Sequence, residues 1–162
     1  MTDMKAAGGP APCGEARSSQ HGRVMGLDFG GRTVGVAISD PMRMTARGLE
    51  IIRRKDETHL RATFRRLLEI KEEYAVSEIV LGLPLNMDDS VGERARKTLL
   101  FRDELVRKLG IPVHMMDERL TTVEAEEAMS MAGVKRSEFK NYVDQIAAAI
   151  ILKDYLDHYG NN

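Results

Sequence analysis

A single α/β domain built on a mixed five-stranded sheet is the fold that this sequence predicts. Three observations support it: an apolar strand–turn–strand pattern opens the domain, two later apolar segments are separated by helical patterns, and helical patterns close the chain. The chain has 162 residues, of which 43% are hydrophobic and 30% are charged. This length and composition suit one globular domain rather than two.

The first 22 residues differ in composition from the rest of the chain. They contain two of the five prolines and no Ile, Leu, Val or aromatic residue, so we expect a flexible tail over 1–22 and a folded domain over 23–160. The only cysteine, Cys13, cannot form an intrachain disulfide, which fits a reducing compartment. No segment approaches the roughly 20 apolar residues of a membrane helix. We therefore expect a cytoplasmic protein with no membrane partner.

The folded domain opens with an antiparallel meander. An apolar run predicts a strand over 24–29, and another predicts a returning strand over 33–38. Gly30 and Gly31 between them suit a two-residue hairpin turn. A third strand over 48–52 completes the meander.

The second half of the chain alternates helical and strand patterns. In chain order, these predict a helix over 56–74, a strand over 78–83, a helix over 90–109, a strand over 112–116 and helices over about 121–131 and 138–157. The helix over 90–109 has a capping-box start at Ser90 and a glycine stop at Gly110, and Thr121 begins a second capping box. Strands joined by crossover helices pair in parallel, so the predicted sheet is antiparallel first and parallel afterwards.

An acidic residue, Asp28, lies inside the first apolar strand, where an ionised carboxylate needs a partner. Strand side chains alternate, so Asp28 shares a face with Gly26 and Gly30. These glycines leave the surface around the carboxylate bare, with room for a hydrated cation and a phosphate. The alternative is a structural aspartate that accepts hydrogen bonds from neighbouring backbone.

Two further acidic positions could meet Asp28. Asp117 and Glu118 follow a strand at its carboxyl end, where ligand sites of parallel sheets gather, and adjacent side chains diverge, so one of the two faces Asp28. Asp144 borders the core-facing side of the last helix, where small residues such as Ala148 allow a close approach to the sheet. Each position also has a simpler explanation. Asp117 and Glu118 could belong to a solvated strand end, and Asp144 could interact favourably with the helix dipole in the first turn of its helix.

The motifs resemble those of the YqgF/RuvX family, whose members are described as pre-16S rRNA nucleases and as Holliday-junction-resolvase-like proteins. The matching strings, in order, are Leu27-Asp-Phe-Gly30 with Val34-Gly-Val-Ala37, Gly82-Leu-Pro84 with Asp88, Asp117-Glu-Arg-Leu-Thr-Thr122, and Asp144 followed by Ala147-Ala148 and Ile151-Leu152. The resemblance spans about 23–157 and implies a three-layer RNase H-like fold, with helices on both faces of the sheet.

The resemblance also implies site residues. The catalytic and metal-binding carboxylates would be Asp28, Glu118 and Asp144, with Asp117 as a candidate fourth ligand. Residues expected to contact the substrate are Gly30, Arg32, Asn86, Asp88, Arg94 and Arg119. Two loop positions depart from the family pattern: Asp89 replaces an expected glycine, and Gly31-Arg32 replaces a Thr-Lys or similar pair.

Oxygen-only ligands favour Mg²⁺ or Mn²⁺ over zinc, and no His/Cys cluster argues otherwise. Two such ions roughly 3.5 to 4 Å apart could activate a water and stabilise the leaving 3′ oxygen in phosphodiester hydrolysis.

Charge is segregated along the chain although the net charge is only −1. The net charge excludes a globally basic nucleic-acid binder. The segment 43–66, however, contains eight basic and three acidic residues, and Arg94, Arg96 and Lys97 could extend it toward the carboxyl end of the sheet. We expect a phosphate-binding patch there that recognises the backbone and shape of structured RNA or branched DNA, because aromatic residues make up only 5% of the chain. The alternative is a set of solvated helix faces with paired charges.

The expected function is a metal-dependent nuclease that processes the 5′ end of pre-16S rRNA. One alternative is a Holliday junction resolvase, which would dimerise to cut two strands symmetrically, whereas end trimming needs only a monomer. We expect a monomer or a weak homodimer. A third hypothesis is a non-catalytic RNA-binding factor in ribosome maturation or transcription. A two-lobed ATPase, suggested by the Asp28-Phe-Gly-Gly-Arg-Thr33 loop, is excluded by length and by the lack of a second phosphate loop.

Overall fold

The computed structural model describes residues 22–84, 88, 91–117, 127, 130–131, 133 and 135–160, with backbone alone at 136, 139–145 and 160. Apart from Gly22, the predicted tail lies outside the described residues, as do the capping residues Ser90 and Thr121 and most of the predicted helix over 121–131. None of the described helices is long and apolar enough to span a membrane.

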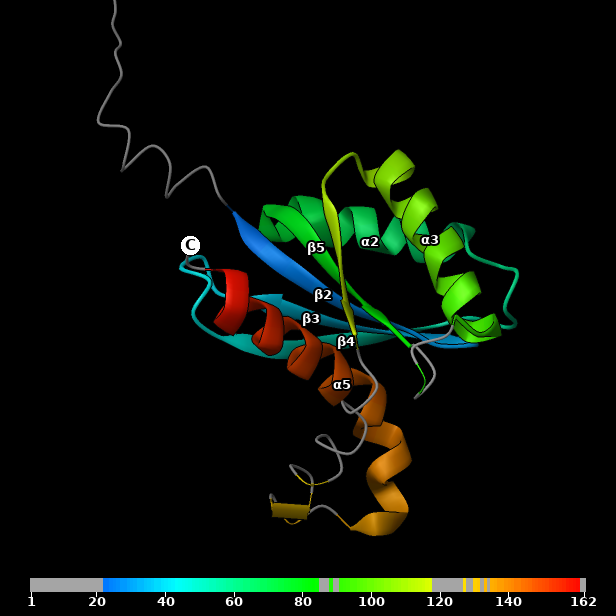
Figure 1. Cartoon of the computed structure of the whole chain (residues 1–162), viewed down its shortest axis with the longest axis vertical. Helices are drawn as coiled ribbons and strands as arrows, with labels where there is room; N and C mark the ends of the chain where they lie inside the picture. Colours follow the sequence, from blue (N-terminus) through cyan, green and yellow to red (C-terminus); the bar gives the residue numbers. More distant parts are fainter. Residues whose placement is uncertain are drawn as a thin grey trace, which may run out of the picture.

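Five strands form one mixed sheet in the order β4-β3-β2-β5-β6 (Figure 1). Their bounds are β2 (Arg23–Phe29), β3 (Thr33–Ser39), β4 (Ala46–Arg53), β5 (Val76–Leu83) and β6 (Val113–Asp117). Strands β2, β3 and β4 pair antiparallel, whereas β5 pairs in parallel with both β2 and β6. The predicted sheet is confirmed, and β2 with its acidic residue lies at its centre.

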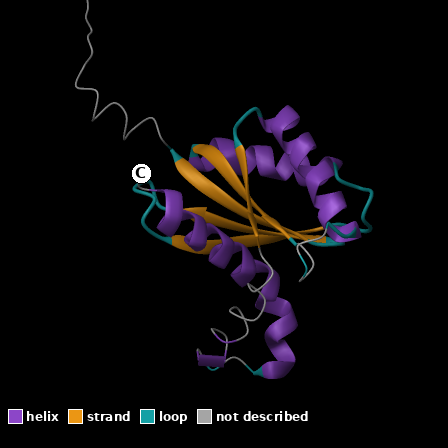
Figure 2. Cartoon of the chain, in the orientation of Figure 1, coloured by secondary structure: helices purple, strands orange, loops and turns teal. Residues whose placement is uncertain are grey.

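Helices cover both faces of the sheet, which confirms the three layers (Figure 2). Helices α2 (Arg61–Tyr74) and α3 (Glu93–Leu109) lie on one face and α5 (Phe139–Tyr155) on the other. A short 3₁₀ turn (Arg136–Glu138) precedes α5 and a π-helical turn (Leu156–Gly160) follows it. The larger apolar core lies under α2 and α3 and includes the stacked rings of Phe29 and Phe101. The smaller core lies under α5.

Helix α5 lies directly on the backbone of β2. A Cβ atom built on Gly26 would lie 2.7 Å from the Cβ of Leu152 and 2.9 Å from the carbonyl oxygen of Ala148. Any side chain at Gly26 would therefore push the helix away from the sheet. The predicted close approach of the alanine-bearing helix is confirmed.

Three local predictions were wrong. The turn between β2 and β3 spans the three residues 30–32, closed by a 2.7 Å hydrogen bond from the Gly30 amide to the Thr33 carbonyl. Helix α2 starts at Arg61 rather than 56, because the Asp56 carboxylate accepts hydrogen bonds from following backbone amides and holds a turn there. Helix α3 starts at Glu93 after Gly92, with no side-chain cap, although its predicted left-handed stop at Gly110 is confirmed.

Candidate active site at the carboxyl edge of the sheet

Asp28 lies near the carboxyl end of β2, on the face that α5 covers. Gly26 contacts α5, and strand alternation places Asp28 on the same face one position further along. Its partner in β3 is Gly35. On the other side, Gly82 of β5 lies beside it, because the preceding residue Leu81 pairs with Leu27. Glycines therefore flank the carboxylate along and across the strands.

Sequence reasoning found Gly26 but missed the cross-strand neighbours Gly35 and Gly82. Their part in the site depends on the register between strands, which no single-strand pattern contains. Both are buried, so the residues that flank Asp28 across the strands carry no side chain and are covered by other parts of the protein.

The register between α5 and β2 places the backbone of Asp144 at the level of Asp28. The end of α5 packs with Val24 at the start of β2, and Ala148 and Leu152 meet Gly26. The helix thus runs antiparallel to the strand. Asp144 is four residues before Ala148, a rise of about 6 Å along the helix, and Asp28 is two residues after Gly26, a rise of about 6.6 Å along the strand.

Asp117 is the last residue of β6 and is exposed. Met115 packs in the core under α2 and α3, whereas Met116 packs in the core under α5. Alternation therefore assigns Asp117 to the α2/α3 face, at the level of Leu83 on β5. Glu118 lies outside the described residues. No group of three or more His, Cys, Asp or Glu side chains that could hold a metal ion occurs within the described part of the chain.

The 30–32 turn beside Asp28 is held by a buried arginine. Arg54 is 8% exposed, and its Nη2 donates to the carbonyl oxygens of Gly30, at 3.0 Å, and Gly31, at 2.5 Å. Its guanidinium carbon lies 5.0 Å from the Phe29 ring centre, and that of Arg94 lies 5.2 Å from the same centre. Desolvation lowers the pKa of Arg54, and the neighbouring charge of Arg94 lowers it further.

A carboxylate, Glu57, faces the basic side chains at this turn. Its Oε1 lies 3.0 Å from Lys97 Nζ and 3.5 Å from Arg94 Nη2. The hydrogen bond from Lys97 is the main cause that lowers the pKa of Glu57, and the charges of Lys97 and Arg94 add to it. The sequence analysis counted Arg54 and Glu57 among the charged residues of the segment 43–66, but it did not place either of them at the glycine turn. The only signal was their position just after the third strand, at the same sheet edge as the glycine turn.

The predicted substrate-contacting residues are only partly brought together. Gly30, Arg32 and Arg94 meet at the turn, where Arg32 is exposed and Arg94 Nη1 lies 3.5 Å from the position of a Cβ on Gly31. Asp88 is also exposed. Asn86 and Arg119 lie outside the described residues.

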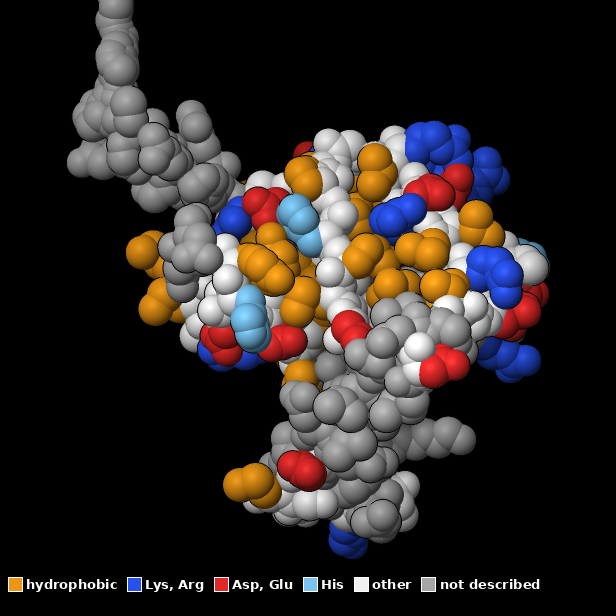
Figure 3. Space-filling view, viewed as in Figure 1, with side chains coloured by type: hydrophobic (Ala, Val, Ile, Leu, Met, Phe, Trp, Pro, Cys, Tyr) orange, Lys and Arg blue, Asp and Glu red, His pale blue; other side chains and the backbone are white. Residues whose placement is uncertain are grey.

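The segment 43–66 does not form one basic patch, which corrects the sequence prediction. Arg43 and Arg54 lie beyond opposite ends of β4, a strand of eight residues and about 26 Å. Arg66 is paired with Glu50 through two hydrogen bonds of 2.9 and 2.7 Å. Basic and acidic side chains are interspersed in the same way over α3 (Figure 3). The basic residues of this segment are therefore divided between the two ends of β4, and Arg54 lies at the end that carries the 30–32 turn.

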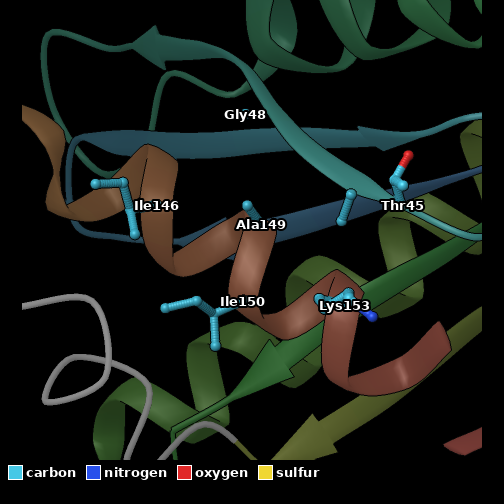
Figure 4. A pocket seen from close by; sticks show the side chains of 7 residues that line it. Thr45, Gly48, Ile146, Ala149, Ile150 and Lys153 are labelled. Atoms are coloured by element: carbon cyan, nitrogen blue, oxygen red, sulfur yellow. The ribbon is translucent and has the colours of Figure 1, made fainter. Parts of the chain in front are cut away.

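An apolar groove of about 680 Å³ lies elsewhere, between β4 and α5 (Figure 4). It is lined by Thr45, Ala46, Gly48, Ile146, Ala149, Ile150 and Lys153. None of the predicted site residues whose side chains the structure describes lines this groove.

Comparison with known proteins assigns the chain to a family. The sequence model of the family RuvX, described as Holliday junction resolvase, matches residues 22–158. A protein of Agathobacter rectalis named "Putative pre-16S rRNA nuclease" is 51% identical over 140 residues, which cover 86% of this chain and 98% of the relative. A protein of the same name from Lachnospira eligens is 49% identical over 135 residues, covering 83% and 96%.

Solved structures of resolvases share the fold at low sequence identity. RuvC of Thermus thermophilus, in complex with a Holliday junction substrate, superposes with a TM-score of 0.52 at 15% identity and covers 87% of this chain and 98% of its own. The fowlpox virus resolvase in complex with Holliday junction DNA gives 0.51 at 14% identity, covering 84% and 97%. The central strand with its acidic residue and the closely packed helix α5 therefore belong to an RNase H-like fold of the resolvase type. Because the family model matches most of its length, this chain belongs to the RuvX family.

Proposed function

We propose that this protein is a metal-dependent nuclease that hydrolyses phosphodiester bonds and processes the 5′ end of pre-16S rRNA. The observation that carries the proposal is Asp28, a carboxylate in the central strand with glycines on three sides and Asp144 at its level on α5. Relatives about half identical in sequence, named for pre-16S rRNA cleavage, support this substrate. The cytoplasm is the proposed compartment, because the single Cys13 cannot form an intrachain disulfide.

The residues at this edge fit a hard divalent cation. Asp28, Glu118 and Asp144 would hold Mg²⁺ or Mn²⁺, because carboxylate oxygens are the ligands these ions prefer. We favour Glu118 over Asp117 as the third ligand, because alternation places Asp117 on the α2/α3 face, opposite to the face that carries Asp28. Such ions supply Lewis acidity toward the phosphate and make a water a stronger nucleophile at neutral pH.

The chain's own residues bind and orient the nucleic acid. Helix α5 fixes the position of Asp144 relative to Asp28 through its contact with Gly26. The 30–32 turn, with Arg94 and Arg32, would hold the backbone of the strand being cut. These contacts are to phosphates, so they orient RNA without reading its sequence. End trimming in this way requires only one copy of the chain.

A second candidate function is resolution of four-way DNA junctions. It is favoured by the family's description as Holliday junction resolvase and by the shared fold of two resolvases solved with junction DNA. Symmetrical cleavage of a junction would require two copies of the chain. A junction-dependent homodimer would therefore distinguish this function from end trimming.

The test is cleavage by the full-length protein of an rRNA precursor with an extended 5′ end and, separately, of a four-way DNA junction, each with Mg²⁺ or Mn²⁺. We expect cleavage of the RNA, no cleavage in EDTA, and a loss of about 100-fold or more for Asp28→Asn, because even changing groups that only support metal ligands costs 10- to 100-fold. Asp103→Asn removes an equal charge from an exposed site on α3 and is the matched control.

Each other outcome has a definite meaning. Full activity of a purified Asp28→Asn variant would remove Asp28 from the metal site. Cleavage of the junction but not the RNA would favour the second candidate. RNA binding by a folded wild-type protein that cuts neither substrate would identify a non-catalytic RNA-binding factor.

A further inference from the structure

Two arginines at the 30–32 turn bury N–H groups that make no hydrogen bond to any described residue. These groups are Arg54 Nη1 and the Nε and Nη2 atoms of Arg94, all shielded from solvent. Of the three, Arg94 Nη2 lies in ion-pair range of Glu57 Oε1, at 3.5 Å. Leaving a buried donor unsatisfied costs about 1–3 kcal/mol, and more for a charged group. Both guanidinium groups also lie over one face of Phe29, because Phe101 stacks on the ring at 4.1 Å. The fold thus brings two like charges together and leaves part of their hydrogen-bonding capacity unused.

Glu57 lies over the same turn. Its Cδ lies 3.9 Å from the position of a Cβ on Gly31, next to Arg94 Nη1 at 3.5 Å from that position. The carboxylate lies in ion-pair range of Arg94 and Lys97, yet its side chain is 46% exposed and belongs to the loop between β4 and α2. It can therefore move away without disturbing the core.

We propose that Glu57 stands in for a phosphate: it occupies Arg94 and Lys97 in the free protein and is displaced when a phosphodiester of the bound nucleic acid reaches the 30–32 turn. The inference rests on the proposed function, because it assigns part of the binding site of the same nuclease. A phosphate offers more acceptor oxygens than a carboxylate, so besides replacing Glu57 at Nη2 it could accept from Arg94 Nε, to which no described residue offers an acceptor.

The position of the turn identifies which phosphate would bind. Gly31 is the third residue after Asp28, which is at most about 11 Å of extended chain. The bound group would therefore be a phosphate that flanks the bond being cut. Gly31 has no side chain to cover the turn, so the strand can approach the backbone closely.

Displacement of Glu57 predicts that removing its charge strengthens binding. For Glu57→Gln we expect the affinity for RNA to rise about threefold to fivefold. This increase corresponds to the free energy of one exposed ion pair, which the RNA no longer has to break. For Arg94→Gln we expect weaker binding and a dependence of log K on log salt that is shallower by about 1, as for one lost phosphate contact.

The chain offers a closely matched control. Glu104 on α3 pairs with Arg107 and Lys108 in the same way as Glu57 pairs with Arg94 and Lys97, but it lies far along the helix from the turn. Glu104→Gln changes the net charge equally, so any gain from general electrostatics should be equal in the two variants.

The experiment measures fluorescence anisotropy of a labelled RNA hairpin with a single-stranded 5′ extension, in EDTA, for wild type and the three variants. Tighter binding of Glu57→Gln than of Glu104→Gln supports the proposal. Equal or weaker binding of Glu57→Gln overturns it, and if wild type still cuts the RNA with Mg²⁺, the proposed function stands. A protein that neither binds nor cuts RNA overturns both.

A second readout does not depend on nuclease activity. Inorganic phosphate added to ¹⁵N-labelled protein should shift the Nε resonance of Arg94 at lower concentration in Glu57→Gln than in wild type or Glu104→Gln. Identical titrations in the three proteins would contradict a phosphate site that Glu57 occupies.

Discussion

A buried arginine lies at each end of the central strands, and the two arginines differ in how completely they are hydrogen-bonded. At the amino end, Arg43 is 9% exposed, and its Nε, Nη1 and Nη2 donate to the Gly22 carbonyl, Glu78 and Ser77 at 3.1, 3.3 and 2.9 Å. At the carboxyl end, Arg54 is equally buried, but its Nη1 meets no acceptor among the described residues. Each guanidinium nitrogen of Arg43 thus donates a hydrogen bond within the protein, whereas Nη1 of Arg54 donates none to the described residues.

The partner of Arg43 is satisfied as well. Glu78 accepts a 3.3 Å hydrogen bond from the hydroxyl of Tyr155, and His114 Nε2 lies 3.5 Å from the same carboxylate. The His114 ring stacks on Tyr155 with centroids 5.3 Å apart. Arg43 and Glu78 therefore each have several partners within the domain, which is the arrangement expected of a structural cluster.

The difference shows how stability and binding can be divided within one sheet. A satisfied cluster has little left to offer a ligand, so it contributes to folding alone. An incompletely satisfied cluster costs stability in the free protein and regains it when a ligand supplies the missing acceptors. Variants that affect the two ends differently can test this division.

The largest effect should come from Gly26, which lies between the two ends under α5. Gly26→Ala would place a Cβ 2.7 Å from Leu152 and 2.9 Å from the Ala148 carbonyl, so the helix must move. We expect a loss of about 2 kcal/mol in the free energy of unfolding, measured by urea denaturation. Cleavage should fall about 100-fold, because a shift of about 1 Å in α5 moves Asp144 away from Asp28. Unchanged cleavage by a destabilised variant would show that α5 does not position the site.

The next effect compares the two buried arginines directly. Arg43→Met should lower the free energy of unfolding by about 2–3 kcal/mol, because it removes three hydrogen bonds and leaves Glu78 without its main cation. Arg54→Met should cost only about 1 kcal/mol, because the loss of its hydrogen bonds to Gly30 and Gly31 is partly offset by removal of the buried Nη1 group, to which no described residue offers an acceptor.

Binding should show the reverse order for the same pair of variants. RNA affinity, measured by anisotropy, should fall for Arg54→Met and stay at the wild-type value for Arg43→Met. If both variants lost stability and affinity alike, the two ends would not differ in role.

The smallest effect concerns Tyr155 at alkaline pH. Burial raises the pKa of its hydroxyl, and the negative charge of Glu78 raises it further. A group with a raised pKa stabilises the fold fully below its unfolded value, about pH 10, and this contribution is lost as pH rises through the folded pKa. The stability of wild type relative to Tyr155→Phe should therefore fall above about pH 10 in urea unfolding series. Parallel pH profiles would contradict the coupling between Tyr155 and Glu78.

The sequence was sufficient for the order of elements and for the central acidic residue. Apolar periodicity predicted all five strands and the helices α2, α3 and α5, because each of these must bury one face. Asp28 was identifiable because a carboxylate inside an apolar strand conflicts with its surroundings.

The rest of the site depends on relations between elements that are distant in sequence. Gly35 and Gly82 become neighbours of Asp28 only through strand register. Summing charges over 43–66 merged Arg43 with Arg54, although a full strand separates them. The pairing of Glu57 with Lys97 joins a loop to a helix 40 positions later, and no local pattern predicts it.

The hydrogen bonds from Arg54 to the 30–32 turn also affect the electrostatic potential of the surface that the turn presents. An open backbone turn offers carbonyl oxygens as readily as amide groups, and those oxygens repel an anion. Because Arg54 draws the oxygens of Gly30 and Gly31 inward, their lone pairs are occupied before any ligand arrives. These two carbonyl oxygens therefore no longer face an incoming nucleic acid. Repulsion between the backbone of the turn and a phosphate is reduced before the phosphate binds.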